Sequence, residues 1–400
     1  MKKITSVFFS LVFALVSFTT ALSANDSFSV SAAKVYETPY YYNQLSDEAQ
    51  EVYNTLKEAV LECKKTVKIK CNIEQDDFEQ IAELLILHDP MTFNLKDMEA
   101  KSATRTSITF NLKYRYSKES YEKMVASYEK AVDKILAKLD DDMSTYSKIK
   151  TIHDSIANIA VYDMDYKLSD TMYGTIVKKK GKCDGYAKTF SYICGQAGIR
   201  TVTVIGDDIY STDDTLHMWN KVYYNKNWYN VDVTWDDPVG NMKNNRRYDF
   251  FMVSDKTLRK THTEDNLSFT VPAAKDSSKT YFKVYKKYAE DTASAKEIIQ
   301  SELEKAAKKG IKYITLQCAT YSSYKNVCKY VNDVEKLCAA LEKAGKKNKN
   351  LVTDLYSYGN NDEYRTIKIY IFYKGTDLED YYIGKVDKDM AEALDYYGID

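Results

Sequence analysis

The feature that most constrains the fold of this chain is a helical pattern followed by a hairpin pattern. Apolar residues recur at helical spacing over residues 183–197. Residues 217–224 and 227–235 are then two β-rich runs separated by the polar pair Asn225-Lys226, which is typical of a tight β-hairpin. The sequence therefore predicts a largely buried helix followed by an antiparallel strand pair.

Cys183 stands in the first turn of the expected helix. The N-terminus of a helix presents free N–H groups and a partial positive charge. Both favour a thiolate, the form of cysteine that attacks carbonyls, and the same N–H groups could stabilise an oxyanion. Cys183 is therefore a candidate nucleophile. The alternative is a buried structural thiol, like Cys194 further along the same helix.

The hairpin brings a histidine and an aspartate to one face of the expected sheet. With the tight turn in its expected place, His217 falls opposite Thr234, and Asp232 is its diagonal neighbour on the same face. A register shift of one residue would separate the two side chains. An aspartate at this position can orient the imidazole and stabilise its charged form. Cys183, His217 and Asp232 thus form a candidate triad for acyl transfer.

The triad and its surroundings resemble the transglutaminase-like superfamily. The matching stretches are residues 173–174, 181–187, 217–222, 228–238 and 250–255. The resemblance covers roughly residues 144–260 and implies an α+β fold, a papain-like core with the cysteine-bearing helix packed on an antiparallel sheet. It also implies that Cys183 is the nucleophile, His217 the general base and acid, and Asp232 the orienting group. The whole chain is similar to exported bacterial proteins that carry this domain between smaller α/β modules.

Two aromatic residues are candidates for substrate binding. Trp219 shares the face of the candidate histidine, with core packing as the alternative. Tyr173 precedes the cysteine turn and could support the oxyanion site, again with packing as the alternative. The other histidines receive structural interpretations: His153 is expected to pack on an apolar helix face, and His88 and His262 to lie at the surface.

Four parts are expected along the chain. They are a signal peptide at residues 1–24, an N-terminal α/β module with a long helix at 36–140, a transglutaminase-like catalytic domain at 144–270, and a C-terminal α+β module at 290–400. No internal repeat is visible.

The first residues have the pattern of an export signal. Lys2 and Lys3 precede an uncharged, mostly apolar run over residues 4–22, and Leu22-Ser23-Ala24 offers a small-residue cleavage site. We therefore expect the protein to be secreted or to lie on the cell surface. The alternative is an uncleaved membrane anchor, since the run is nearly long enough to span a bilayer.

The seven cysteines leave the redox state open. An odd number means that at least one thiol is free or pairs between molecules. Cys63 could pair with Cys71, and Cys318, Cys328 and Cys338 could pair among themselves. The alternative is that most of the cysteines are reduced and buried, and pack like small apolar side chains.

The net charge and the sequence motifs limit the classes of ligand and partner that this chain is expected to bind. A net charge of −1 gives no support to nucleic-acid binding. No zinc spacing, EF-hand loop or phosphate-binding glycine motif is present, so we expect no metal and no cofactor. The expected partners are peptide or protein substrates, cell-wall peptides among them, with membrane contact only through an uncleaved signal segment.

These observations predict a secreted cysteine-dependent enzyme that acts on peptide or protein amides through a Cys183 thioester. Superfamily members include cross-linkers, peptidases and amidases, so the resemblance does not fix the reaction. Hydrolysis is favoured over cross-linking because no residue pattern marks an amine-acceptor site. The alternative is a non-catalytic module that binds cell wall or protein and keeps the fold only as a scaffold.

Overall fold

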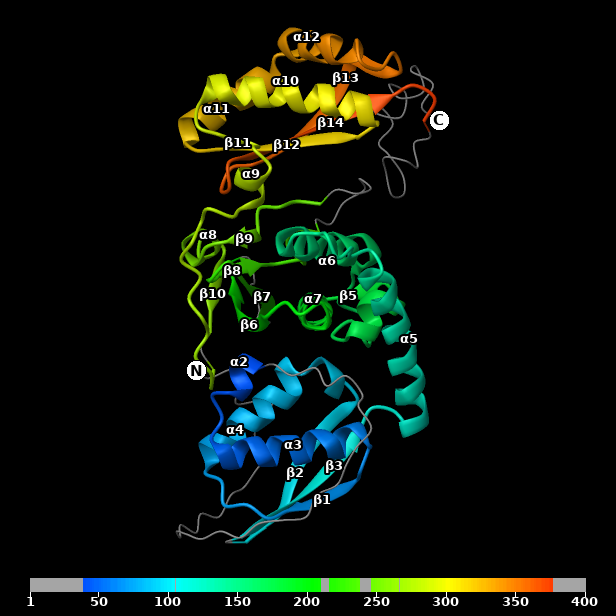
Figure 1. The fold of residues 1–400 in the computed structure, drawn as a ribbon, viewed down its shortest axis with the longest axis vertical. Helices are drawn as coiled ribbons and strands as arrows, with labels where there is room; N and C mark the ends of the chain where they lie inside the picture. Colours follow the sequence, from blue (N-terminus) through cyan, green and yellow to red (C-terminus); the bar gives the residue numbers. More distant parts are fainter. Residues whose placement is uncertain (1–38, 105, 210–215, 238–245, 266, 377–400) are drawn as a thin grey trace. The chain divides into compact units, whose positions relative to one another are not determined.

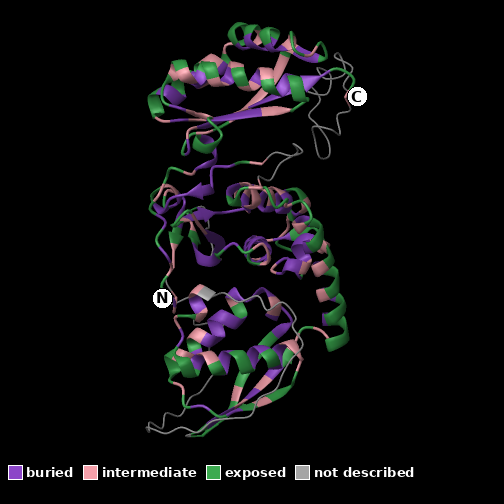
Figure 2. Ribbon diagram, in the orientation of Figure 1, coloured by how far each residue is buried: buried purple, intermediate pink, exposed green. Residues whose placement is uncertain are grey.

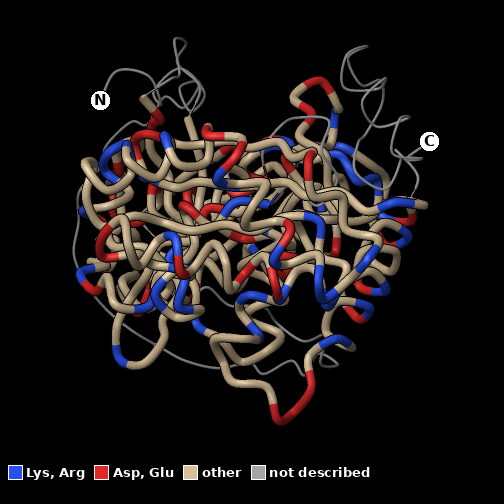
Figure 3. Tube along the Cα trace, turned by 90° about the horizontal axis from the view of Figure 1, so that it is seen from above, with Lys and Arg blue, Asp and Glu red and all other residues tan. Residues whose placement is uncertain are grey.

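The structure is a computed structural model. It describes residues 39–104, 106–209, 216–237, 246–265 and 267–376. The expected signal peptide, residues 1–24, lies outside the described residues. Among the described residues no helix combines the length and the apolar character needed to cross a membrane. Basic and acidic residues are interspersed along the chain (Figure 3), whose net charge is −1.

The chain divides into two compact units (Figure 1). The first comprises Met1–Thr234 and Thr261–Ala274, and the second comprises Trp235–Lys260 and Lys275–Asp400. The N-terminal module shares a unit with the cysteine-bearing segment because hydrogen bonds join them, such as that from the Tyr41 hydroxyl to the Thr203 carbonyl (2.8 Å). Residues 235–260 belong to the second unit, where Asn361 donates to the Asp249 carboxylate (3.2 Å).

The N-terminal part of the first unit is a three-stranded sheet with helices. Its helices are α2 (Pro39–Tyr42), α3 (Asp47–Leu61), α4 (Gln75–Glu83) and the long α5 (Lys118–Leu136), with the short turns η1 (Leu84–His88) and η2 (Pro90–Thr92). The sheet order is β1 (Thr66–Ile69), β3 (Ser107–Tyr114), β2 (Leu95–Thr104). Ser46 and Ser117 begin α3 and α5 because their side chains accept N–H bonds from the first turn.

The core of the first unit is a helix packed on an antiparallel sheet (Figure 1). Its helical elements are α6 (Thr145–Ile159), η3 (Tyr173–Val177) and α7 (Cys183–Gln196), and β4 (Val161–Tyr162) pairs with β5 (Lys180–Gly181). The strand order within this unit is β10 (His262–Glu264), β6 (Thr201–Asp208), β7 (His217–Tyr224), β8 (Asn227–Val231). Helix α7 and these strands are mostly buried (Figure 2), and the mixed architecture confirms the expected α+β class.

The predicted hairpin is confirmed with its register. Tyr224 pairs with Asn227 across the turn. Asn225 and Lys226 adopt positive φ values of 47° and 64°, the conformation that a two-residue type I′ turn requires. Helix α7 is joined to the sheet by the Asn220 side chain of β7, which donates to the Ala187 carbonyl (3.0 Å).

His88 was predicted to lie at the surface, and this prediction is wrong. The ring is buried where η1 meets β6, with Nδ1 2.6 Å from the Thr203 hydroxyl and Nε2 3.2 Å from the Glu83 carboxylate. Burial lowers the pKa of His88, which favours a neutral ring that donates to Glu83 and accepts from Thr203. Local sequence could not indicate this environment because Thr203 lies far along the chain.

The second unit packs helices on a four-stranded sheet. Its main helices are α10 (Thr292–Lys309), α11 (Tyr321–Asn332) and α12 (Val334–Gly345), with β9 (Phe251–Val253) and the short helices α8 (Asp255–Leu258) and α9 (Tyr281–Val284). The sheet order is β11 (Tyr288–Ala289), β12 (Tyr313–Cys318), β14 (Thr366–Tyr373), β13 (Leu351–Asn361). Gly310, with a φ of 64°, ends α10. Apolar residues at helical spacing over residues 327–344 predict a single helix, but the structure has two helices there, because the extended Asp333 accepts from the Lys336 N–H and caps α12.

All seven cysteines are free thiols in the structure. The structure therefore agrees with the interpretation that the cysteines are reduced, and it contains no disulfide. Cys71, Cys194 and Cys318 are buried like ordinary apolar side chains, and burial raises the pKa of each of these three thiols. These cysteines therefore act as packing residues.

Candidate active site

Cys183 is the first residue of α7, as predicted. Its side chain is largely buried, and its sulfur lies 3.5 Å from a carboxylate oxygen of Asp184 and 3.9 Å from the carbonyl oxygen of Leu216. Leu216 directly precedes β7, so the contact fixes the helix start against the strand that carries His217. Cys183 stands at the start of the helix, where the N–H groups of the first turn have no intrahelical partner.

Glycines allow the backbone to approach closely around this helix start. A Cβ atom on Gly185 would lie 2.2 Å from the Ser169 carbonyl oxygen and 2.4 Å from the Thr175 hydroxyl. A side chain would therefore push the preceding loop away from Cys183. Gly206 on β6 has a similar role, since its Cβ would lie 1.9 Å from the Thr263 carbonyl oxygen of β10.

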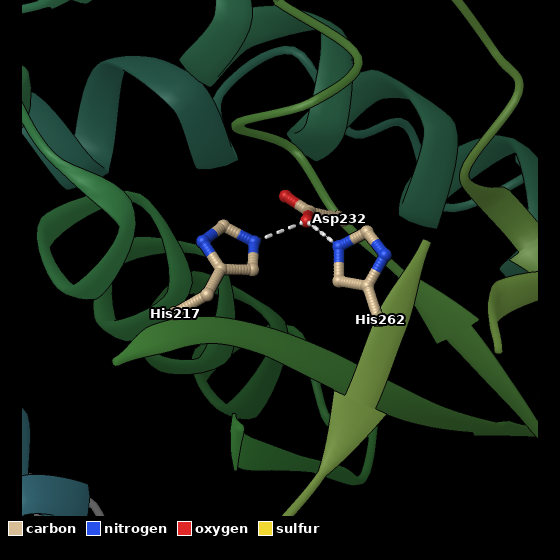
Figure 4. Close-up of side chains that lie close together, drawn as sticks. All are labelled: His217, Asp232 and His262. Atoms are coloured by element: carbon tan, nitrogen blue, oxygen red, sulfur yellow. Dashed lines mark hydrogen bonds and ion pairs between the residues drawn. The ribbon is translucent and has the colours of Figure 1, made fainter. Parts of the chain in front are cut away.

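The structure brings His217 and Asp232 together (Figure 4). His217 opens β7 and Asp232 follows β8, so the confirmed hairpin register places both on one face. The Nε2 atom of His217 donates to Oδ2 of Asp232 at 2.6 Å, and both side chains are buried. This bond leaves Nδ1 of His217 for the thiol of Cys183, which is its other hydrogen-bond partner.

The electrostatics of the pair favour charged forms of both groups. Burial alone would lower the pKa of His217, but the Asp232 carboxylate and then the Cys183 thiol outweigh it and raise that pKa to about 10. Burial alone would raise the pKa of Asp232, but His217 and then His262 hold it well below its usual range. An imidazolium held by a carboxylate beside a thiol is the arrangement that generates a reactive thiolate.

His262 is a member of the site that the sequence did not predict. Its expected surface position is wrong, because the ring is buried and Nε2 lies 3.0 Å from Oδ2 of Asp232, the same atom that His217 contacts (Figure 4). Its Nδ1 atom lies 2.8 Å from the Thr261 hydroxyl. Strand β10 supplies the residue through pairing with β6, in which His262 faces Asp208. No local motif indicates that pairing.

The two aromatic candidates lie in different surroundings. Trp219 is almost fully buried, stacks on the ring of His217 at a centroid distance of 6.0 Å, and donates through Nε1 to Asn230 at 3.1 Å. It therefore supports the imidazole from within the core. Tyr173 lies in η3 and is half-buried, and the ammonium of Lys178 lies 5.4 Å from the centre of its ring.

Three donor atoms of the site could also hold a metal ion. The side-chain donors of His217, Asp232 and His262 lie within 4.8 Å of one another, and two imidazoles with one carboxylate form a donor set that Zn²⁺ accepts. In the structure both Nε2 atoms are hydrogen-bonded to the Asp232 carboxylate. A metal ion would have to replace both hydrogen bonds, including the one that orients His217 toward Cys183.

Comparison with known proteins supports the family. Residues 129–233 match the profile of the Transglutaminase-like superfamily. The chain carries a transglutaminase-like domain. The matched segment contains Cys183, His217 and Asp232, whereas His262 lies beyond its end. The transglutaminase-like domain therefore accounts for three of the four clustered side chains.

The relatives match only over short stretches. Kyphoscoliosis peptidase from Mus musculus is 40% identical over 65 residues, covering 14% of this chain and 10% of that protein. The Homo sapiens protein is 38% identical over 65 residues with the same shares, so the match spans about a tenth of these relatives. A TGase crystal structure is 16% identical, covers 42% of this chain and 50% of its own, and has a TM-score of 0.25.

Proposed function

We propose that the transglutaminase-like domain is a cysteine-dependent enzyme that cleaves amide bonds of peptides or proteins through a thioester on Cys183. The observation that carries this proposal is the buried 2.6 Å bond between His217 and Asp232, with His217 also bonded to a thiol at a helix N-terminus. A scaffold that only binds partners has no need of a buried carboxylate that charges this imidazole.

The proposed reaction has two halves. The Cys183 thiolate attacks the amide carbonyl, and N–H groups at the start of α7 stabilise the resulting oxyanion. The His217 imidazolium gives its proton to the leaving nitrogen as the carbon–nitrogen bond breaks, which leaves a thioester. Neutral His217 then takes a proton from water as the water oxygen attacks the thioester. The carbon–sulfur bond then breaks, which releases the carboxylic acid and leaves the Cys183 thiolate beside the His217 imidazolium, as at the start.

The experiment that tests this proposal separates the acyl acceptors. The protein is incubated with casein and a biotinylated primary amine, beside a Cys183→Ala control. We expect new peptide N-termini or free carboxylic acid with no incorporated biotin. Incorporation of the amine would show transamidation and contradict hydrolysis. No turnover, together with a Cys183 thiol no more reactive than Cys194, would favour the binding-module alternative.

We propose that the protein acts outside the cell, on peptides or proteins that include cell-wall peptides. The support is the charged and apolar pattern of residues 1–24. Expression of the full chain followed by N-terminal sequencing tests this proposal. A start near residue 25 in the medium supports cleavage and release, whereas retention of residues 1–24 in a membrane fraction would indicate an anchor.

The raised pKa of His217 makes a prediction about alkaline pH. The unperturbed value is 6.5 and the folded value about 10, so the charged imidazole stabilises the fold fully below pH 6.5, and this contribution is lost as the pH rises through 10. We expect the melting temperature of the wild type to fall more between pH 7 and 10.5 than that of His217→Gln. Parallel curves for the two proteins would contradict a charged His217. His217→Gln keeps every lysine and tyrosine of the wild type, so the comparison cancels their titration in the same pH range.

A further inference from the structure

One buried side chain of the site is not used by the proposed reaction. His262 reaches Asp232 from β10, outside the segment that matches the superfamily. Gly206 lets β10 approach β6 closely enough for this contact, since a side chain there would collide with the Thr263 carbonyl. The Oδ2 atom of Asp232 consequently accepts two imidazole N–H groups, at 2.6 Å and 3.0 Å.

The surroundings of His262 fix which nitrogen donates. A neutral ring that carries its proton on Nε2 donates to Asp232 and accepts at Nδ1 from the Thr261 hydroxyl, 2.8 Å away. The groups that face the ring from packed elements are His217 and Trp219 of β7, with ring centroids at 5.1 Å and 5.3 Å, and Asp208 of β6 across the strand pair. A neutral donor here leaves the positive charge on His217.

We propose that His262 is a positioning residue of the cysteine site, whose Nε2–H group holds the Asp232 carboxylate ionised and directed at His217. This inference rests on the proposed function of the domain. A buried carboxylate is costly unless several donors satisfy it, and a hydrogen bond to its charged form favours that form. His262 provides such a donor from a strand on the far side of β6. His262 touches neither the thiol nor the substrate in this role.

The test measures the reactivity of Cys183 without any substrate. The folded full-length protein is alkylated with iodoacetamide from pH 4.5 to 8, and the modification of Cys183 is quantified by peptide mass spectrometry with Cys194 as the buried reference. The acid limb is the low-pH part of the plot of Cys183 alkylation rate against pH. We expect His262→Leu to move this limb to higher pH, with alkylation about tenfold slower at its low-pH end. His262→Gln keeps an N–H donor and is expected to restore most of the wild-type profile.

Two further variants separate positioning from stability. His88→Leu removes another buried histidine, bonded to Glu83 and Thr203, and should lower the melting temperature without moving the acid limb. Thr261→Val removes the hydroxyl at nearly constant shape, so it should shift the limb in the same direction as His262→Leu but less. This variant carries the test if His262→Leu does not fold.

The outcomes distinguish this inference from the proposed function. An unchanged limb in folded His262→Leu, or in Thr261→Val where the leucine variant fails to fold, would overturn the positioning role alone. An acid limb at the same pH in His262→Gln as in His262→Leu would also overturn the positioning role, because loss of the N–H donor would then not be the cause of the shift. A wild-type Cys183 that reacts no faster than Cys194 at neutral pH would overturn both the positioning role and the proposed enzyme.

Discussion

Replacement of Cys183 by alanine is expected to lower kcat/KM for any amide substrate by about 10⁴-fold or more, to the background of the assay. The reason is that Cys183 alone forms the acyl intermediate in the proposed reaction, whereas His217 transfers protons and Asp232 charges and orients the imidazole. Fold and substrate binding should persist because the change removes one sulfur atom with few contacts. Steady-state kinetics with thermal denaturation of both proteins measures the effect.

Cys194 supplies the matched control for this prediction. It lies on the same helix, but burial raises the pKa of its thiol well above the usual value, so it stays protonated. Cys194→Ala should keep near-wild-type activity and lose some stability through a small cavity. Activity that survives in Cys183→Ala and disappears with EDTA would instead assign the chemistry to a metal ion at His217, Asp232 and His262.

The parts of the structure that depend on neighbouring residues were accessible from sequence. The helix start at Cys183 and the hairpin turn at Asn225-Lys226 each follow from side chains within a few positions. Once the register was fixed, strand geometry alone put His217 and Asp232 on one face. The contact between these two residues thus follows from local rules, because only one short turn separates their strands.

The parts that the sequence did not reveal depend on pairing between distant segments. His262 and His88 each follow an unremarkable local sequence, and their partners come from strands or helices far along the chain. Strand β2 escaped prediction because it has a mostly exposed face and pairs with β3 through two bulges. The break between α11 and α12 at Asp333 was not predicted because apolar residues continue at helical spacing across it. One capping aspartate is nevertheless sufficient to start a new helix there.

Substitution of Asp232 by asparagine should isolate the charge of the site from its geometry. The amide oxygen can take the place of Oδ2 and accept from both His217 and His262, so the ring positions are expected to persist. The negative charge is lost, and with it the largest contribution that raises the pKa of His217 to about 10. The imidazole then returns toward its ordinary pKa of 6.5, and less of it is charged beside Cys183 at neutral pH.

We expect kcat of Asp232→Asn to fall by about 10⁴-fold, the loss found when the triad aspartate of a serine protease is replaced by asparagine. The alkaline limb of the pH profile should move down from near 10 toward neutral pH. Asp184→Asn is the matched control, because that carboxylate lies 3.5 Å from the Cys183 sulfur without contacting His217, and its loss should change kcat by less than about tenfold. An Asp232→Asn protein with an unmoved alkaline limb would show that burial and Cys183, and not the carboxylate, determine the charge of His217.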